Sequence, residues 1–472
     1  MASLQSGKNP LCVVAFLLVL SSLCMWLPAL WTPFWGDDYV FLQAAHAANI
    51  AGVPWWQVFW PEHAVRFWRP LSQGGYWRLM VALTGGNAFA MHAVNLFLHI
   101  AACVGVGAFV ASLAKACHWP HARLTAALAG ALYASLALHF LPVHWASAIN
   151  NSLLVLFSSM ALALWLDACR AQGFARVWRL ASVPILLVLA MLSKESAILT
   201  PALLVLASLF AGDDCRRRGE VVTLLVCVVA AAVWLVLDRH FTAHVDAAYR
   251  LQLGTNVLRN SVAMIAWLLN VPREAIRMAT VGNKIVALAW IAVTALPVLF
   301  VWLVAGRQAC RRLKAKQWLA LGAFAVIGYG PCFLFAWNSY PYYAAISALV
   351  VVIVVSLACA CRPQLAWLLV LVALSSWIGV ATTRRLAPPS LMGRAHWGEQ
   401  LLRQLQHQPV KTPLWVVTEN PHRFYAVGRA GLTWRLRIPA TSIHLVRRCP
   451  DDAQSCLVLP RQGHWYWKAR QP

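Results

Sequence analysis

Acidic residues are scarce in this chain of 472 residues. It has 15 Asp and Glu against 39 Lys and Arg, and only 11% of its residues are charged. A soluble domain carries about 25% charged residues, so the composition excludes an ordinary soluble enzyme. The hydrophobic content of 61% also excludes a disordered chain. The basic excess is scattered between apolar runs and forms no single basic face, which argues against a nucleic-acid binder. A polytopic membrane protein remains.

The sequence also lacks internal repeats, low-complexity tracts and cysteine pairs with zinc-site spacing. It has 13 Cys, and eleven of them lie in or beside apolar runs, where cysteine behaves as a small hydrophobic residue. Cys449 and Cys456 are the exception, because they lie in polar sequence near the C-terminus. In an oxidising compartment we expect this pair to form a disulfide that closes a tight loop, with two free thiols as the alternative.

Long apolar runs predict about eleven transmembrane helices, because about 20 apolar residues cross the hydrocarbon core. We place the spans at 11–30, 90–113, 124–139, 148–167, 179–193, 196–211, 221–237, 284–305, 317–336, 342–361 and 364–381. The first run lacks a small residue before Cys24 and is therefore expected to be a retained helix, not a cleaved signal peptide. Residues 257–271 are interrupted by polar side chains, so we expect an interfacial helix there, with a twelfth span as the alternative.

The distribution of Lys and Arg in short loops sets the orientation. Four basic loops are assigned to the cytoplasm: 114–123, 168–178, 212–219 and 306–316. The turn 140–147, on the opposite side, carries no Lys or Arg. The N-terminus is then cytoplasmic, the C-terminus is periplasmic, and the large outer loops are 31–89 and 238–283.

The composition changes after residue 381. Charged residues return, and three short runs bounded by turn residues are typical of strands: Trp415–Val417, Ile443–Val446 and Leu457–Leu459. We therefore predict two parts, a transmembrane catalytic domain at 1–381 and a small extracytoplasmic α/β appendage at 382–472.

Two adjacent carboxylates, Asp37 and Asp38, follow the first span among aromatic residues typical of the headgroup level. Neighbouring carboxylates in different environments can have their pKa values pushed apart, which leaves one of them suited to proton transfer. A general base with a helper is one interpretation. An N-cap for a helix at 39–50 is the other.

The rest of the first outer loop mixes aromatic residues with polar ones, which predicts interfacial helices facing an anionic group. The aromatic residues are Trp55, Trp56, Phe59, Trp60, Phe67, Trp68 and Trp77, and the polar ones are Glu62, His63, Arg66, Arg69 and Arg78. Arginine presents a bidentate fork to phosphate, so a phosphate at the membrane surface is the expected ligand. Headgroup anchoring is the alternative, above all for Arg66 and Arg78.

Lys194 and Glu195 lie between the apolar runs 179–193 and 196–211. Ionisable groups are costly in such a place and usually functional. A cation there can stabilise the charge that develops on a departing phosphate. The alternative is a self-neutralising pair that only turns a helical hairpin.

Five motifs in this order resemble those of the GT-C superfamily of integral membrane glycosyltransferases. The likeness is greatest to its protein O-mannosyltransferase-like members and to the transferase that adds aminoarabinose to lipid A. The motifs are Asp37-Asp38-Tyr39, Phe67-Trp68-Arg69-Pro70-Leu71-Ser72, His92-Ala93-Val94-Asn95-Leu96-Phe97-Leu98-His99, His139-Phe140-Leu141-Pro142-Val143-His144 and Ser193-Lys194-Glu195. The match covers about 1–210 and is weaker up to 381. Tetratricopeptide repeats are absent, and the late tyrosine element Ser339-Tyr340-Pro341-Tyr342-Tyr343 lacks the family's Arg.

The resemblance implies a GT-C-type bundle and an inverting transfer of a monosaccharide from a polyprenyl-phosphate donor to a hydroxyl acceptor. The reaction would take place at the outer face of the bacterial inner membrane. Asp37 would be the general base, and Asp38 its neighbour or an acceptor-binding group. Arg69 and Lys194 would bind the donor phosphate, and the composition of the loop adds Arg66 to them.

Further residues are expected to line the substrate cavity: Glu195, His63, Tyr39, His144, Tyr342 and Tyr343. In the second outer loop, five residues face the same compartment: His240, His244, Asp246, Tyr249 and Arg250. No metal or other cofactor is expected. The expected partners are membrane lipids, the lipid-linked donor and a glycan, lipid or protein acceptor. The alternatives are a transporter or flippase of a lipid-linked saccharide and a non-catalytic subunit of an envelope complex.

Overall fold

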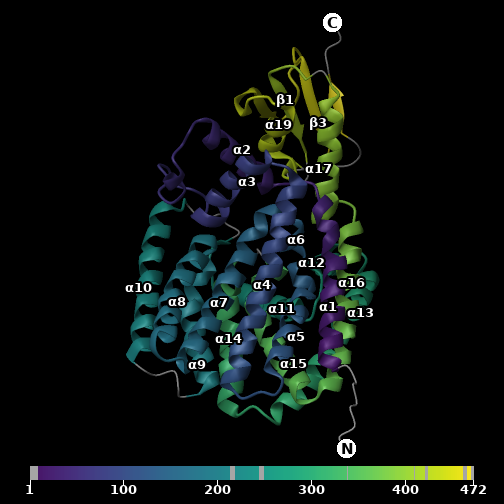
Figure 1. Ribbon diagram of the computed structural model, residues 1–472. Coiled ribbons are helices and arrows are strands. Elements are labelled where there is room, and N and C mark those ends of the chain that lie inside the picture. Colours follow the sequence, from purple (N-terminus) through teal and green to yellow (C-terminus); the bar gives the residue numbers. More distant parts are fainter. Residues whose placement is uncertain are drawn as a thin grey trace, which may run out of the picture.

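The structure is a computed structural model that describes residues 9–212, 218–243, 249–336, 339–408, 410–419, 424–460 and 465–468. Long helices form a bundle, and a small sheet lies at one end of it (Figure 1). Helix α1 (Pro10–Trp26) begins at the opposite end of the bundle from this sheet.

The bundle consists of helices that match the apolar runs of the sequence. They are α1 (Pro10–Trp26), α4 (Ala88–Ala116), α5 (Ala122–Ala134), α6 (Phe140–His144), α7 (Ile149–Arg170), α8 (Gly173–Ser193), α9 (Thr200–Ala211), α10 (Arg218–Phe241), α13 (Lys284–Cys310), α14 (Ala315–Tyr329), α15 (Ala348–Cys361) and α16 (Leu369–Arg385). Local signals set several of their ends. The side chain of Asn87 accepts a hydrogen bond from the amide of Ala90 at the start of α4, and Asn283 does the same for Val286 at α13.

Within the described residues, eight helices with their flanking turns are long and apolar enough to cross a membrane. A ninth candidate joins α5 to residues Ala137–His144 with a bend of 54°. Two of the eleven predicted runs, 196–211 and 342–361, instead give the shorter apolar helices Glu195–Ala211 and Ala348–Cys361. The chain is a polytopic membrane protein in which eight of the predicted runs, or nine with the bent pair counted as one span, have the length and composition of a span in the described residues.

The polar-interrupted run at 257–271 forms α11 (Thr255–Leu268), and α12 (Arg273–Val281) follows it. With 14 residues, α11 is not among the helices of spanning length. A helix of that size is about 21 Å long, whereas the hydrocarbon core is about 30 Å thick. The Asn260 side chain donates to the carbonyls of Phe333 and Phe335. These contacts favour the prediction of a helix that does not span.

The C-terminal appendage is built from α17 (Leu391–Gln406), α19 (Gly428–Leu436) and a four-stranded sheet of order β2-β1-β3-β4. Strand β1 (Leu414–Thr418) pairs in parallel with β2 (Ile443–Val446) and β3 (Ser455–Leu459), and β4 (Tyr466–Lys468) is antiparallel to β3. The three predicted strands are therefore present, and β4 is an addition. Cys449 and Cys456 are joined by a disulfide.

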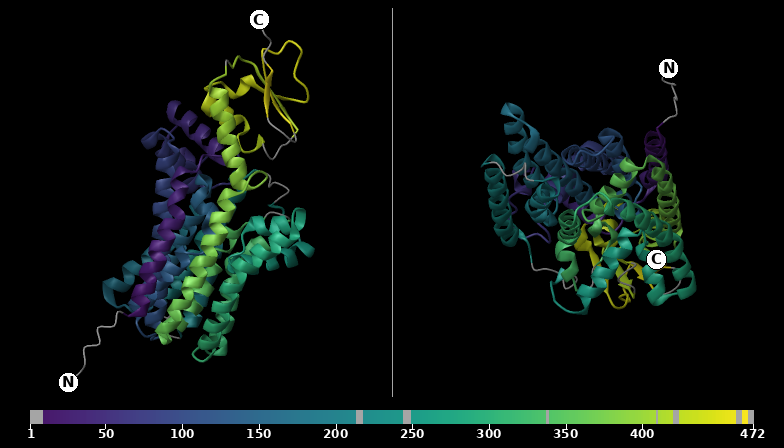
Figure 2. Two further views of the ribbon diagram at one scale, coloured as in Figure 1. Left: turned by 90° about the vertical axis from the view of Figure 1, so that its right-hand side faces the viewer. Right: turned by 90° about the horizontal axis from the view of Figure 1, so that it is seen from below.

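The appendage shares one apolar core with the first outer loop. Helices α2 (Asp37–Ile50) and α3 (Tyr76–Thr84) of that loop lie beneath the appendage (Figures 1 and 2). Buried side chains of this core come from both parts: Tyr39, Leu42, Trp77, Leu401, Val416 and Leu432. Because burial of apolar surface is the main stabilising term in packing, this shared core fixes the appendage on α2.

Candidate functional site

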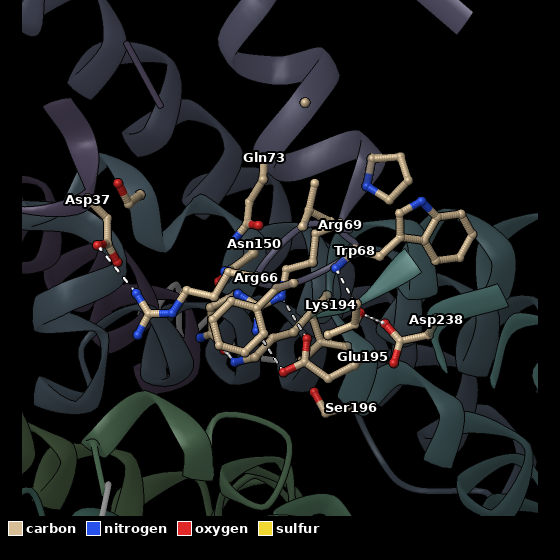
Figure 3. Close-up of a pocket in the computed structure, with 18 of the residues that line it drawn as sticks. Asp37, Arg66, Trp68, Arg69, Gln73, Asn150, Lys194, Glu195, Ser196 and Asp238 are labelled. Carbon is tan, nitrogen blue, oxygen red and sulfur yellow. Dashed lines mark hydrogen bonds and ion pairs between the residues drawn. The ribbon is translucent and has the colours of Figure 1, made fainter. Parts of the chain in front are cut away.

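One cavity of about 910 Å³ lies between the first outer loop, the outer ends of α7, α8 and α10, and the segment around 328–346. Eight of the eleven predicted site residues line it: Asp37, His63, Arg66, Arg69, Lys194, Glu195, Tyr342 and Tyr343. Figure 3 shows Asp37 and Arg66 on one side of this group and Arg69, Lys194 and Glu195 on the other. The cavity therefore has a carboxylate end and a cation-rich end.

The cation-rich end is held together by a bidentate pair between Arg69 and Glu195. The Arg69 Nε and Nη2 atoms lie 2.7 Å from the Glu195 Oε2 and Oε1 atoms, respectively. The guanidinium also lies 4.4 Å from the centre of the Phe67 ring. Pairs of this geometry are the strongest side-chain hydrogen bonds. The carboxylate of Glu195 is therefore paired with Arg69, which corrects the alternative of a self-neutralising Lys194–Glu195 pair.

The sequence Pro70-Leu71-Ser72 brings Arg69 to this position. A turn of π-helix, η3 (Pro70–Gly75), begins directly after Arg69. The Ser72 hydroxyl donates to the Ser193 carbonyl over 2.6 Å and so ties this turn to the end of α8. The motif that contains Arg69 and the motif that contains Lys194 thus contact each other, and this hydrogen bond fixes their relative positions.

Lys194 lies where α8 stops. Its backbone is extended, with φ −158° and ψ 134°, so the chain leaves the helix before the short turn η6 (Glu195–Leu199). The Nζ atom donates to the Asn151 Oδ1 atom over 3.0 Å and lies 4.9 Å and 5.4 Å from the ring centres of Tyr342 and Tyr343. An amide oxygen and two aromatic faces offset the cost of burying this cation.

The outer end of α10 supplies a further wall. The amide of Val65 donates to the Phe241 carbonyl over 2.8 Å, and the Thr242 hydroxyl donates to the Asp238 Oδ1 atom over 3.0 Å. Asp238 lines the cavity, as do Asn150 and Asn151 from α7. The sequence reasoning missed these three residues, although each lies at an outer end of a predicted span, where polar side chains in apolar sequence are a usable signal.

At the carboxylate end, Asp37 is the first residue of α2. Its Oδ1 atom accepts a hydrogen bond of 2.9 Å from the Tyr425 hydroxyl and lies 3.9 Å from the Arg66 Nη1 atom. The preceding Gly36 has φ +60°, and a Cβ atom at that position would lie 2.9 Å from the Tyr425 ring. Only glycine fits there at low cost. Asp37 is therefore presented to the cavity with a quarter of its side chain exposed.

Asp38 is in a different environment. It is fully buried and does not line the cavity. Its Oδ1 atom accepts from the Ser147 amide (2.7 Å) and hydroxyl (2.5 Å), and its Oδ2 atom accepts from the Trp35 amide (3.1 Å). Burial raises the pKa of Asp38 to about 7, against the opposing effect of these hydrogen bonds. The expectation that Asp38 binds acceptor is therefore corrected: it fastens the start of α2 to the turn at Ser147.

The N-cap interpretation is also corrected, because the cap position is Gly36 and no side chain caps α2. Helical geometry explains why the two aspartates differ. Residues of α2 that line the cavity follow a spacing of three and four: Asp37, Val40, Phe41, Ala44, Ala45 and Ala48. Asp38 lies about 100° away from Asp37 around the helix and faces the interior.

Tyr39 and His144 are two further corrections, because neither lines the cavity. Tyr39 is 1% exposed and packs in the core shared with the appendage. His144 is fully buried, its Nδ1 atom lies 3.1 Å from the Phe140 carbonyl oxygen, and its ring stacks on the Phe140 ring with centres 4.4 Å apart. Both residues have packing roles.

Of the residues named in the second outer loop, Tyr249 lines the cavity. Its ring meets the Phe67 ring edge to face, with centres 5.2 Å apart. His240 and Arg250 do not line the cavity. His244 and Asp246 lie outside the described residues.

Comparison with known proteins gives structural matches. No protein-family model matches the sequence, and no curated protein matches it. The structure is similar to that of ArnT from Cupriavidus metallidurans in the apo state, with a TM-score of 0.53 and 14% identity over 91% of this chain and 85% of that chain. This likeness shows the fold: the chain shares the helical bundle of that structure, in agreement with the bundle that the sequence motifs implied.

Two weaker likenesses have TM-scores below 0.5. One is to ArnT from Cupriavidus metallidurans bound to undecaprenyl phosphate, with a TM-score of 0.49 and 14% identity over 91% of this chain and 85% of that chain. The other is to the archaeal oligosaccharyltransferase AglB from Archaeoglobus fulgidus in complex with an inhibitory peptide and a dolichol-phosphate. It has a TM-score of 0.48 and 11% identity over 90% of this chain and 63% of that chain.

Proposed function

We propose that this protein is a glycosyltransferase that moves a pentose or hexose from a polyprenyl-phosphate donor to a hydroxyl acceptor. The observation that carries the proposal is a cavity in which a partly exposed carboxylate, Asp37, lies opposite the buried Lys194 and Arg69, whose side chain is 10% exposed. Such a transfer needs a base that accepts the proton of the acceptor hydroxyl and cations that bind the donor phosphate. The fold likeness to ArnT is in agreement.

The cavity also has a wall suited to a lipid chain. Apolar side chains also line it, among them Trp234 and Leu235 of α10, Ile198 of η6, and Ile346, which precedes α15. Their burial against a polyprenyl chain is favourable, because each CH₂ removed from water contributes about 0.8 kcal/mol. We propose that the donor lies with its chain along this wall and its phosphate at Lys194 and at the Arg69 Nη1 group, which Glu195 does not engage.

In the proposed reaction Asp37 accepts the proton of the acceptor hydroxyl as its oxygen attacks the anomeric carbon. A glycosidic bond forms, and the bond from the anomeric carbon to the phosphate oxygen breaks on the opposite face. The product is inverted at this carbon, and polyprenyl phosphate leaves with the bonding electron pair. Lys194 and Arg69 stabilise the charge that develops on the phosphate. No step requires a metal ion.

We further propose that the cavity faces the periplasm of the bacterial inner membrane. The appendage and helix α2, which lines the cavity, lie at the end of the bundle away from the start of α1 (Figure 1). The basic loops 114–123 and 306–316 favour the cytoplasm for the other end.

The test is reconstitution of the purified chain with synthetic polyprenyl-phosphate pentoses and hexoses and a lipid extract as the source of acceptor. We expect free polyprenyl phosphate and a glycosylated lipid, with equal rates in the presence and absence of EDTA. Passage of the intact donor across a vesicle membrane without its cleavage would instead support the flippase alternative. Absence of both cleavage and passage would favour the non-catalytic one.

A further inference from the structure

In the appendage, Tyr425 contacts the proposed catalytic base, Asp37. Tyr425 precedes α19, yet its hydroxyl donates to the Asp37 Oδ1 atom over 2.9 Å, a contact between residues 388 positions apart in the chain. A second bond lies beside it, because the Gly36 amide donates to the Ala426 carbonyl over 2.9 Å. The backbone on both sides of the contact is thus linked.

Packing fixes this contact. The Tyr425 ring fills the space that a side chain at position 36 would need. Helix α19 packs on α2, and Leu432 of α19 and its N-cap residue Val427 are buried with Tyr39 in the shared core. Tyr425 itself is 40% exposed, so the adjacent backbone bond and the packing of α19 on α2 hold it in place.

The charged and titratable groups around Asp37 are Asp38 of the same helix, Arg66 further along the first outer loop and, through its interaction with Tyr425, Tyr340. Tyr425 itself does not line the cavity. A hydroxyl that donates to a carboxylate favours the ionised, basic form of that carboxylate and restricts its rotation.

We propose that Tyr425 is a positioning residue for Asp37, and that the C-terminal appendage is thereby an integral part of the transferase site. This inference rests on the proposed function of Asp37 as the base. Tyr425 keeps its proton throughout and acts only through the orientation and ionisation of the carboxylate. The hydrogen bond to Asp37 thus comes from the appendage and not from the membrane helices, and it completes the base end of the cavity.

The test compares Tyr425→Phe with Tyr466→Phe in the full chain. Both changes delete a tyrosine hydroxyl from the appendage, and Tyr466 lies on β4, about half exposed and outside the cavity. For each variant we would measure kcat, the KM for donor, the pH dependence of kcat and the Tm.

For Tyr425→Phe we expect kcat to fall about tenfold, the scale of one lost hydrogen bond to a charged group, with the donor KM and Tm close to wild type. The acid limb of the pH profile should move to higher pH by about half a unit to one unit, because the carboxylate loses a donor that favours its ionised form. Tyr466→Phe should match the wild type in all four measurements.

A wild-type kcat and pH profile in Tyr425→Phe would overturn this inference alone. So would a lower kcat accompanied by a lower Tm and an unmoved acid limb, since that pattern means a structural role. A wild-type chain without any donor cleavage would overturn the proposed function and this inference with it.

Discussion

The two ends of the cavity are built in different ways. At the cation-rich end, the proposed phosphate end, Arg69 and Glu195 make two bonds of 2.7 Å, the Arg69 side chain is 10% exposed, and Lys194 is buried. At the carboxylate end, the proposed base end, Asp37 has a 2.9 Å bond to Tyr425 and a 3.9 Å approach to Arg66, whose side chain is 54% exposed. The first outer loop and the turn after α8 therefore preorganise the cation-rich end, and contact with the appendage assembles the carboxylate end.

A second contrast lies within the base end, between two adjacent carboxylates. Asp37 faces the cavity, and Asp38 is buried on three hydrogen bonds. The two aspartates are adjacent in α2, so the helical rotation between neighbouring residues separates the proposed catalytic group, Asp37, from the structural one, Asp38. This contrast predicts opposite consequences for the same chemical change at the two positions.

The largest expected effect is that of Asp37→Asn. Turnover should fall by about 10³- to 10⁴-fold, because an amide cannot accept the acceptor proton. The Tm should stay near that of the wild type.

Asp38→Asn should have the reverse effect and lower the Tm. In either orientation of the asparagine side chain, its NH₂ group would face a hydrogen-bond donor of Trp35 or of Ser147. Equal loss of turnover with equal Tm in both variants would remove the distinction between them.

The next effect concerns the phosphate end. Lys194→Met keeps an unbranched side chain only one atom shorter and removes its charge, so turnover should fall by about 10²- to 10³-fold through loss of electrostatic stabilisation. Lys115→Met is the control, since Lys115 is exposed near the far end of α4. Initial rates at saturating donor measure the effect. Similar rates in the two variants would show that Lys194 has no part in the reaction.

The third effect is a dependence of stability on pH that Asp38 contributes. Its pKa is raised by burial from 3.8 to about 7, so between these values the folded chain binds a proton that the unfolded chain has released. This contribution to stability is largest at low pH and is lost as pH rises, by about 2 kcal/mol between pH 5 and pH 7. Unfolding measured at pH 5, 6 and 7 should show a smaller decline in Asp38→Asn than in the wild type. Parallel curves for the two proteins would contradict the assignment.

The smallest effect is expected for Glu195→Gln. The amide cannot reproduce both bonds to Arg69, so the guanidinium loses its fixed orientation, and turnover should fall about tenfold. Asp167→Asn removes the acid from a comparable pair with Arg170 at the other end of the bundle and should leave turnover unchanged. Turnover in Glu195→Gln at the wild-type rate would mean that Arg69 needs no orientation by Glu195.

The sequence predicts the phosphate end better than the base end. Lys194 and Glu195 lie at a break between apolar runs, where an ionisable side chain is conspicuous. Arg69 stands before Pro70-Leu71-Ser72 in the first outer loop, and the structure brings all three together. Whether Asp38 faces the cavity or the interior depends on which residue starts α2, because a shift of one residue places a side chain on a different face of the helix. The position of Gly36 as the cap is not marked in the sequence.

Long-range pairing is the part that the sequence does not reveal. Nothing in the neighbourhood of Tyr425 indicates a contact with residue 37, because the contact depends on how α19 packs on α2. The strands of the appendage are predictable, since their short apolar runs are local features. The surface on which the sheet and its helices dock is a property of the folded chain only.

The division of the cavity is the central claim, and the binding of polyprenyl phosphate tests it most directly. The Kd would be measured for the purified wild type, Asp37→Asn and Lys194→Met in the same detergent. We predict that Asp37→Asn, although inactive, binds within about twofold of the wild type, whereas Lys194→Met binds at least about tenfold more weakly. Loss of affinity in Asp37→Asn together with wild-type affinity in Lys194→Met would contradict the account.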